Sequence, residues 1–376
     1  MPKNKGQFED ISSGRQKKKM PLKKKLLIAL CIVVIIVCTL VITAMILLNS
    51  KLFQGGEGDI SSEIQTEEEI KEDVVSFLIC GIDDEEGRGL GERTDLIMYV
   101  TFDIKAGKVD ILQIPRDTYV ENTSTNKINA VYGRKENGGV QGLASEINRL
   151  FKLPVDHYAT IKMDGFKDLV DAIGGVTMDV PYDYDWGGGL TVKKGLQTLD
   201  GAHAEVIVRH RGAAGSSTGN YALGDISRLQ IQRLFIAAMM EQLLELSKTE
   251  LLGLVPTLLN YVSTDLTPNQ MMGFLGVVNG LSMDHVVMHL LPGEGIPPAY
   301  ALYSVHLQAT ADLLNESFRP YSAEVAAEEL ECVEMYNQTT YLDGNQGVLG
   351  EIVGGDSGQS SSSQSSSNSS ASDSAA

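Results

Sequence analysis

The sequence predicts an α/β domain, in which helices flank a mixed central β-sheet, preceded by one transmembrane helix. In the middle of the chain, short apolar runs rich in β-branched residues alternate with stretches of helical periodicity, and this alternation is typical of an α/β sandwich. Near the N-terminus, residues 26–48 form an apolar run of 23 residues without a charged side chain. At about 1.5 Å per residue, such a helix is roughly 34 Å long and can cross a bilayer.

The charges around this run predict how it is oriented in the membrane. Residues 1–25 contain nine lysines or arginines and two acidic residues. Basic residues stay on the cytoplasmic side, so everything after the run is expected outside the cell. A cleaved signal peptide is the alternative, but the run is too long for a signal-peptide core and no A-x-A cleavage site follows it. The sequence therefore predicts an uncleaved single-pass anchor in the cell membrane.

The composition of the remaining chain predicts its domain boundaries. Residues 49–73 are an acidic linker, residues 74–320 the folded extracellular domain, and residues 321–352 an acidic extension. Residues 353–376 are rich in serine and cannot bury a core, so we expect this tail to be disordered. The whole chain carries a net charge of −18 although its N-terminus is basic, which argues against binding of nucleic acid. An arginine cluster that binds phosphate must then be a local pocket.

Three apolar runs at the start of the domain are expected to be buried strands: Phe77–Ile82, Leu96–Phe102 and Val109–Ile114. Charged residues stand where these runs begin or end: Asp83, Asp84, Arg93, Asp95, Arg116 and Asp117. If the strands pair in one sheet, these side chains converge at its rim. Carboxylates bind divalent cations and arginines bind phosphate with paired donors, so the residues predict a metal-assisted phosphate site.

The rest of the domain is expected to alternate between helices and strands. Helices are predicted at residues 128–132, 139–151, 166–173, 200–208, 225–246, 251–281 and 305–318. Strands are predicted at residues 155–163, 176–180 and 286–291, and loops at 182–189 and 212–220. Leu229, Phe235, Ile236 and Met239 form an apolar stripe on the long helix, which fits either a packed core or the wall of a lipid slot.

Several stretches of this chain resemble, in order and spacing, the LytR-CpsA-Psr family of Gram-positive cell-envelope proteins. They are LICGIDD, RTD and ILQIPRDTYV, then KINAVYG, DGFKDLVDAIGGVTMDVP, LDGAHAEVIVRHR and GDISRLQIQR. The resemblance covers roughly residues 74–318. The chain departs from the family pattern at Ile231, where the family has arginine, at Arg233, where it has glutamine, and at Glu85, where it often has arginine.

The resemblance implies roles for individual residues. Asp83 and Asp95 match acids that hold a divalent cation, Mg²⁺ or Mn²⁺. A second set matches positions that bind pyrophosphate: Arg93, Arg116, Lys127, Arg209, Arg211, Arg228 and Gln232. Arg116 and Asp95 are assigned to catalysis, while the general base stays open between Asp95 and Asp117.

The function implied by the resemblance is that of a membrane-anchored extracellular phosphotransferase. Such an enzyme moves a glycopolymer (teichoic acid, capsular or other secondary wall polysaccharide) from a polyprenyl-pyrophosphate carrier to peptidoglycan. One alternative is a pyrophosphatase that acts on the same lipid with water as acceptor. The other is a non-catalytic envelope or regulatory protein.

Three further signals carry less weight. Residues 215–219 fit the G-x-S-x-G pattern but lack the strand and helix of a nucleophile elbow, and His285 and His289 lack the glutamate of a zinc helix. Cys80 and Cys332 are expected either to form a disulfide outside the membrane or to be two small buried side chains with free thiols.

Overall fold

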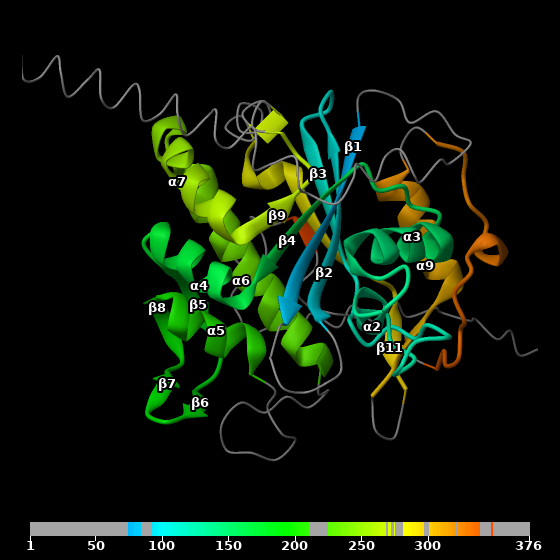
Figure 1. Cartoon of the computed structure of the whole chain (residues 1–376), viewed down its shortest axis with the longest axis horizontal. Helices are drawn as coiled ribbons and strands as arrows, with labels where there is room; N and C mark the ends of the chain where they lie inside the picture. The colour runs from blue at the N-terminus through cyan, green and yellow to red at the C-terminus, as the bar shows by residue number, and fades with distance from the viewer. Residues whose placement is uncertain are drawn as a thin grey trace, which may run out of the picture. The chain divides into compact units, whose positions relative to one another are not determined.

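The computed structural model (Figure 1) describes residues 74–83, 92–210, 225–267, 270–271, 274, 281–296, 301–319, 322–338 and 347–348. The predicted transmembrane helix, the basic N-terminus, the acidic linker and the serine-rich tail lie outside these residues, as do Asp84, Glu85, Arg211 and the loop at 212–220. Within the described ranges, no helix is long and apolar enough to cross a bilayer.

The three predicted strands form an antiparallel meander at the centre of one sheet. They are β1 (Val74–Asp83), β2 (Arg93–Asp103) and β3 (Lys108–Gln113). Buried and half-buried residues alternate along β1, which is the period-2 pattern expected of a strand in a sheet.

The sheet is mixed because two further strands run parallel to this meander. β4 (His157–Lys162) pairs with β1 and β10 (Val286–Leu290) pairs with β3. The described strands follow the order β13-β10-β3-β2-β1-β4-β9, with β9 (Val262–Thr264) and β13 (Gly347–Val348) antiparallel at the two edges. This confirms the predicted mixed central sheet.

Helices cover both faces of the sheet (Figure 1). On one face lie α2 (Asn129–Tyr132), α3 (Gly139–Phe151) and α9 (Leu307–Leu313), followed by the π-helix η4 (Leu314–Phe318). Side chains from α3, α9 and η4 share a core with Leu78, Ile97, Tyr99 and Leu112 of the meander. The apolar stripe of α3, which is Leu143, Ile147 and Leu150, is buried there.

The opposite face carries α6 (Asp225–Glu245), whose Ile236 and Ala237 pack on Met98 and Val100 of β2. Beside α6 lie α4 (Met163–Ala172), α5 (Gly201–Arg209) and α7 (Lys248–Tyr261). This side is completed by two antiparallel strand pairs. One is β5 (Val176–Val180) with β8 (Gly195–Leu199), and the other is the hairpin of β6 (Tyr184–Gly187) and β7 (Leu190–Val192). Asp200 caps α5, since its Oδ1 accepts a hydrogen bond of 2.9 Å from the His203 backbone nitrogen.

Three element boundaries differ from the prediction. The helix expected over residues 251–281 is interrupted after Tyr261, because Val262–Thr264 pairs with β4 and Thr264 Oγ1 donates a hydrogen bond to the carbonyl oxygen of Tyr158. Residues 270, 271 and 274 are again helical. The loop expected at residues 182–189 contains β6. Residues 303–305 form β12, which pairs with β11 (Gly293–Gly295), so the closing helix begins only at Leu307.

The acidic extension packs on the domain over its described residues, 322–338. Val325 and Leu330 belong to the same buried core as α3. Glu331 bonds to Arg149 at 2.9 Å and to Lys152 at 2.6 Å. The extension therefore belongs to the folded unit.

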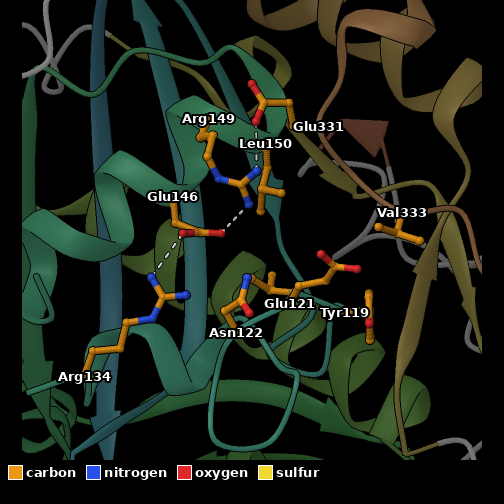
Figure 2. A pocket seen from close by; sticks show the side chains of 10 residues that line it. Tyr119, Glu121, Asn122, Arg134, Glu146, Arg149, Leu150, Glu331 and Val333 are labelled. Atoms are coloured by element: carbon orange, nitrogen blue, oxygen red, sulfur yellow. Dashed lines mark hydrogen bonds and ion pairs between the residues drawn. The ribbon is translucent and has the colours of Figure 1, made fainter. Parts of the chain in front are cut away.

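Where the extension meets α3, it closes a pocket of about 340 Å³. Figure 2 shows Glu146 between Arg134 and Arg149, with Glu331 of the extension reaching Arg149. The nitrogen–oxygen distances from Glu146 are 3.2 Å to Arg134 and 2.6 Å to Arg149. Because these charges satisfy one another, the pocket is best explained as a structural junction.

We expect Leu330→Ala to lower the free energy of unfolding by about 2 to 4 kcal/mol, because Leu330 is 5% exposed and leaves a cavity in the core. Val333→Ala, three residues later and 42% exposed, should change it by less than about 0.5 kcal/mol. Chemical denaturation of the full chain measures both. Equal stability of the two variants would mean that the extension does not dock in solution.

Both described cysteines are free thiols, so the disulfide alternative is wrong. Cys80 is completely buried in β1, and the Cys332 thiol lies 3.5 Å from the carbonyl oxygen of Leu150. Burial raises the pKa of Cys80 far above its ordinary value and that of Cys332 to about 12. Neither thiol is ionised at neutral pH, so Cys80 acts as a small buried side chain and Cys332 as a half-buried one.

Candidate functional site

Asp83 and Asp95 reach the site through the pairing of β1 with β2. Asp83 ends β1 and lies opposite Arg93, the first residue of β2. The register shifts between Gly81 and Ile82, which pair with residues 96 and 94, and Asp95 is left as the extra residue on β2. Such a bulge redirects a side chain at the edge of a sheet. Both carboxylates consequently line the same pocket.

The turn after β3 carries an alternating row of charges. Arg116 Nη1 lies 2.6 Å from Asp95 Oδ1, and Arg116 Nε lies 3.8 Å from Asp117 Oδ1. Lys127, just before α2, binds the same Asp117 oxygen at 2.9 Å. Arg116 and Asp117 are each 8% exposed, so these pairs are shielded from water. The structure thus brings together four of the predicted residues, including both candidate bases.

Arg209 connects the last turn of α5 to the sheet. Its Nη1 bonds to Glu205, one helical turn earlier, at 2.8 Å. Its Nη2 lies 3.8 Å from Asp83 Oδ1. Arg209 therefore joins Asp83 at the same pocket, as the sequence predicts for a shared site, while Arg211 lies outside the described residues.

Arg228 and Gln232 lie one turn apart on α6, as their spacing predicts. Arg228 is 1% exposed and Gln232 is 6% exposed. The Gln232 amide is held at both ends: its Nε2 donates to the carbonyl oxygen of Val208 at 3.0 Å, and its Oε1 accepts from Gln113 at 3.2 Å. Gln232 lines the pocket, but it also fixes α6 against the ends of α5 and β3.

Arg233 is a site-supporting residue that sequence reasoning missed. It is completely buried, and its Nη1 donates to Gln113 Oε1 at 2.5 Å. Gln113, also completely buried, stands three residues before Arg116. The sequence signal was present, because arginine replaces the glutamine of the family pattern at this position.

Arg93 supplies donors for an anion. Its Nε and Nη2 atoms are buried and have no hydrogen-bond partner within the described part of the chain. Leaving a buried donor unsatisfied costs about 1 to 3 kcal/mol or more when it is charged. A phosphate oxygen is the acceptor that such a guanidinium prefers.

Behind the charged residues lies an apolar pocket of about 400 Å³. Asp83, Asp95, Arg209 and Gln232 stand at its polar end. Its walls come from strands β1, β2, β4 and β9 on one side and from helices α4, α6 and α7 on the other. Of the predicted stripe, Phe235, Ile236 and Met239 line the pocket, whereas Leu229 is buried elsewhere.

This arrangement suits an amphiphile, with hydrocarbon in the pocket and an anionic head group at the charged end. A metal at that end has two hard oxygen donors available, Asp83 and Asp95. Within the described residues, no group of three or more histidine, cysteine or acidic side chains is placed to hold an ion. Two carboxylates therefore fit magnesium only if phosphate and water complete its shell.

Comparison with known proteins finds a matching family and several relatives of similar sequence. The LytR_cpsA_psr family model matches residues 50–319. The chain is 30% identical to Bacillus subtilis TagU over 230 residues, which is 60% of this chain and 70% of TagU. It is 30% identical to Bacillus mycoides TagU over 68% of this chain and 82% of that protein. It is also 32% identical to Bacillus subtilis TagV, over 43% of this chain and only 42% of TagV. All three are named polyisoprenyl-teichoic acid–peptidoglycan teichoic acid transferases.

Solved structures share the fold. The crystal structure of Bacillus subtilis TagV superimposes with a TM-score of 0.54 at 24% identity, over 70% of this chain and 100% of that one. The structure of TagT bound to LIIa-WTA superimposes with a TM-score of 0.52 at 23% identity, over 70% of this chain and 97% of that one. A mixed sheet with helices on both faces is therefore the architecture of these proteins too.

Proposed function

This chain belongs to the LytR-CpsA-Psr family, and from that premise we propose that it transfers a glycopolymer from a polyprenyl-pyrophosphate carrier to peptidoglycan. The observation that carries the proposal is the apolar pocket of about 400 Å³ with Asp83, Asp95 and Arg209 at its end. A polyprenyl chain fits the apolar walls, and pyrophosphate fits the charges. The relatives TagU and TagV are named for the same type of transfer, with teichoic acid as the polymer.

In the proposed reaction, Arg93, Arg116, Arg209 and Arg228 bind and orient the pyrophosphate. Lys127 stands beside them, bonded to Asp117. A hydroxyl oxygen of peptidoglycan attacks the phosphorus that carries the sugar, and the bond from this phosphorus to the bridging oxygen breaks. Polyprenyl phosphate leaves, and the glycan becomes joined to peptidoglycan by a phosphodiester. The hydroxyl proton passes to a carboxylate, for which Asp95 and Asp117 are the two candidates.

Asp83 and Asp95 would hold a divalent cation, Mg²⁺ or Mn²⁺, together with phosphate oxygens. When bound, the ion neutralises charge that develops on the leaving phosphate. Arg116 keeps Asp95 in place through its 2.6 Å bond.

The proposal places the site outside the cell. Residues 26–48 would anchor the chain, residues 1–25 would stay in the cytoplasm, and residues 49–73 would link the anchor to the domain. Residues 74–320 would form the catalytic domain, and residues 353–376 a disordered tail. An anchor in the same membrane as the carrier lipid keeps the site close to its substrate.

Incubation of the purified full chain with lipid-linked glycan and peptidoglycan tests the proposal by product mass. Transfer predicts peptidoglycan that carries glycan and one phosphate, together with released polyprenyl phosphate. Release of free glycan phosphate would identify the pyrophosphatase instead. Absence of turnover with several glycans would favour the non-catalytic envelope or regulatory role.

We expect Asp95→Asn to reduce transfer about a hundredfold and to raise the magnesium concentration needed, because the amide keeps the shape and loses the charge. Combination with Asp83→Asn should add little further loss, since both residues act on one ion. Asp312→Asn, an exposed carboxylate on α9, is the control and should transfer normally. Full transfer by the double variant in EDTA would contradict the metal assignment.

A further inference from the structure

The β6–β7 hairpin displays the chain's single tryptophan near His210, the residue that follows Arg209 of the candidate site. Trp186 is 43% exposed, whereas Tyr184 and Val192 of the same hairpin are each 1% exposed and packed in the core beneath α5 and α6. The hairpin is thus fixed from below. The exposed indole therefore belongs to a hairpin that its buried residues hold in place.

A second β-bulge sets the direction of this side chain. Asp185 pairs with Thr191 and Gly187 pairs with Leu190, so Trp186 is the extra residue on β6. Alternation alone would place Trp186 on the buried face together with Tyr184. At the bulge Trp186 is instead 43% exposed, although its ring, like that of Tyr184, still lies near His210.

The turn of the hairpin directly follows Trp186 and carries no side chain of its own. Gly187, Gly188 and Gly189 have positive φ angles of 84°, 64° and 92°, which glycine adopts without strain. Apart from the residues next to each glycine in the chain, no heavy atom lies within 4 Å of the position that a Cβ would take at any of the three. A turn without side chains leaves room for a flat ligand at this position.

His210 connects Trp186 to the charged end of the pocket. Its ring centroid lies 6.4 Å from that of Trp186 and 5.2 Å from that of Tyr184. His210 directly follows Arg209, whose guanidinium lies 3.8 Å from Asp83. Burial lowers the pKa of His210, so its imidazole is a neutral ring at neutral pH. Trp186 therefore lies near the ring of His210, the residue that follows Arg209 of the proposed pyrophosphate site. Figure 1 shows β6 and β7 next to α5.

We propose that Trp186 binds the glycan of the lipid-linked substrate by stacking its indole on a sugar ring near the pyrophosphate. The inference rests on the proposed function, and it adds the residue that contacts the carbohydrate. An indole offers a wide apolar face with one polar N–H, which matches the C–H face and the hydroxyls of a pyranose. Asp185 adds an exposed carboxylate that can accept from sugar hydroxyls.

A membrane surface is the competing occupant, because tryptophan is also common at bilayer interfaces. The surroundings of Trp186 favour the sugar. Three glycines and Asp185 flank it on the chain. A membrane-inserting tip would need further apolar side chains there, and the exposed Tyr182 and Leu196 lie outside β6 and β7. Asp183 and Lys193 pair with each other at 3.1 Å on the same hairpin, which leaves no basic excess for anionic lipid.

Trp186 fluorescence can report binding directly, since the chain contains no other tryptophan. The full chain in detergent is titrated with three probes: a lipid-linked disaccharide, polyprenyl pyrophosphate without sugar, and sugar-free phospholipid vesicles. We expect the emission to shift with the first probe only. Trp186→Ala should bind the lipid-linked disaccharide about tenfold more weakly and bind the sugar-free pyrophosphate normally. Its KM for transfer should rise with kcat unchanged.

The controls separate this inference from the proposed function. Trp186→Phe should recover part of the affinity. Leu196 is 78% exposed on β8, and Leu196→Ala should bind the lipid-linked disaccharide as tightly as the unmodified protein. If Trp186→Ala binds both lipids like the original chain, the glycan role is overturned while the transferase proposal stands. A shift with vesicles alone would reassign Trp186 to a membrane contact. If neither pyrophosphate lipid binds, both proposals fail.

Discussion

Arg116→Lys should lower transfer by about ten- to a hundredfold while the protein remains folded. Lysine keeps the positive charge between Asp95 and Asp117, which lie 2.6 Å and 3.8 Å from the guanidinium nitrogens. It loses the planar fork that can hold Asp95 with one nitrogen and a phosphate oxygen with another. A charge-assisted hydrogen bond contributes roughly 1.5 to 3 kcal/mol, which corresponds to about this loss of rate.

Arg134→Lys is the matched control, because Arg134 binds Glu146 at 3.2 Å in the pocket under the extension. It should transfer normally if that pocket is a structural junction. Rates come from initial product formation at saturating lipid-linked glycan, and thermal unfolding checks the fold. Normal transfer by Arg116→Lys together with a large drop in melting temperature would make Arg116 a structural ion pair.

The meander and its charged rim could be predicted because both depend on local pattern. β1, β2 and β3 carry alternating or continuous apolar residues, follow one another along the chain, and pair as neighbours in the sheet. Charges at the ends of adjacent strands then have to meet. Asp83, Asp95 and Arg116 were therefore predictable as one group.

The direction of individual side chains at this rim could not be predicted. Asp95 and Trp186 both project from β-bulges, and a bulge depends on which residue of the neighbouring strand is skipped. Asp95 stands before a continuous apolar run and Trp186 within a stretch that reads as a glycine-rich loop, so neither stretch shows which residue the pairing skips. Tertiary pairing decides the register, so only the structure identifies these two residues as redirected.

Short or irregular segments were missed for a different reason. β9 consists of three residues directly after a helix, and so short a strand is stabilised by its pairing with β4 more than by its own propensity. The extension contributes only Val325 and Leu330 to the core, too few apolar residues to stand out in an acidic stretch. Packing against α3 gives the extension its structure.

Arg233→Ala should reduce the free energy of unfolding by about 3 to 5 kcal/mol and also lower transfer. The completely buried guanidinium would leave a cavity, and the side-chain amide oxygen Oε1 of Gln113, 2.5 Å away, would lose a donor. Gln113 in turn donates to Gln232, which is bonded to the end of α5. Loss of Arg233 therefore loosens the contact of α6 with both β3 and α5, the elements that position Arg116 and Arg209.

Arg233→Gln separates the hydrogen bond from the charge. Glutamine is the residue of the family pattern at this position, and its amide can still donate to Gln113, so we expect it to retain more stability than alanine. Glu241→Gln, half-exposed on the same helix, should leave stability and transfer unchanged. Urea denaturation and initial transfer rates are measured on the same preparations. If Arg233→Ala unfolds at the same urea midpoint as the unmodified protein and still fails to transfer, Arg233 acts on the substrate itself. A residue that only holds α6 in place cannot be removed from the core without loss of stability.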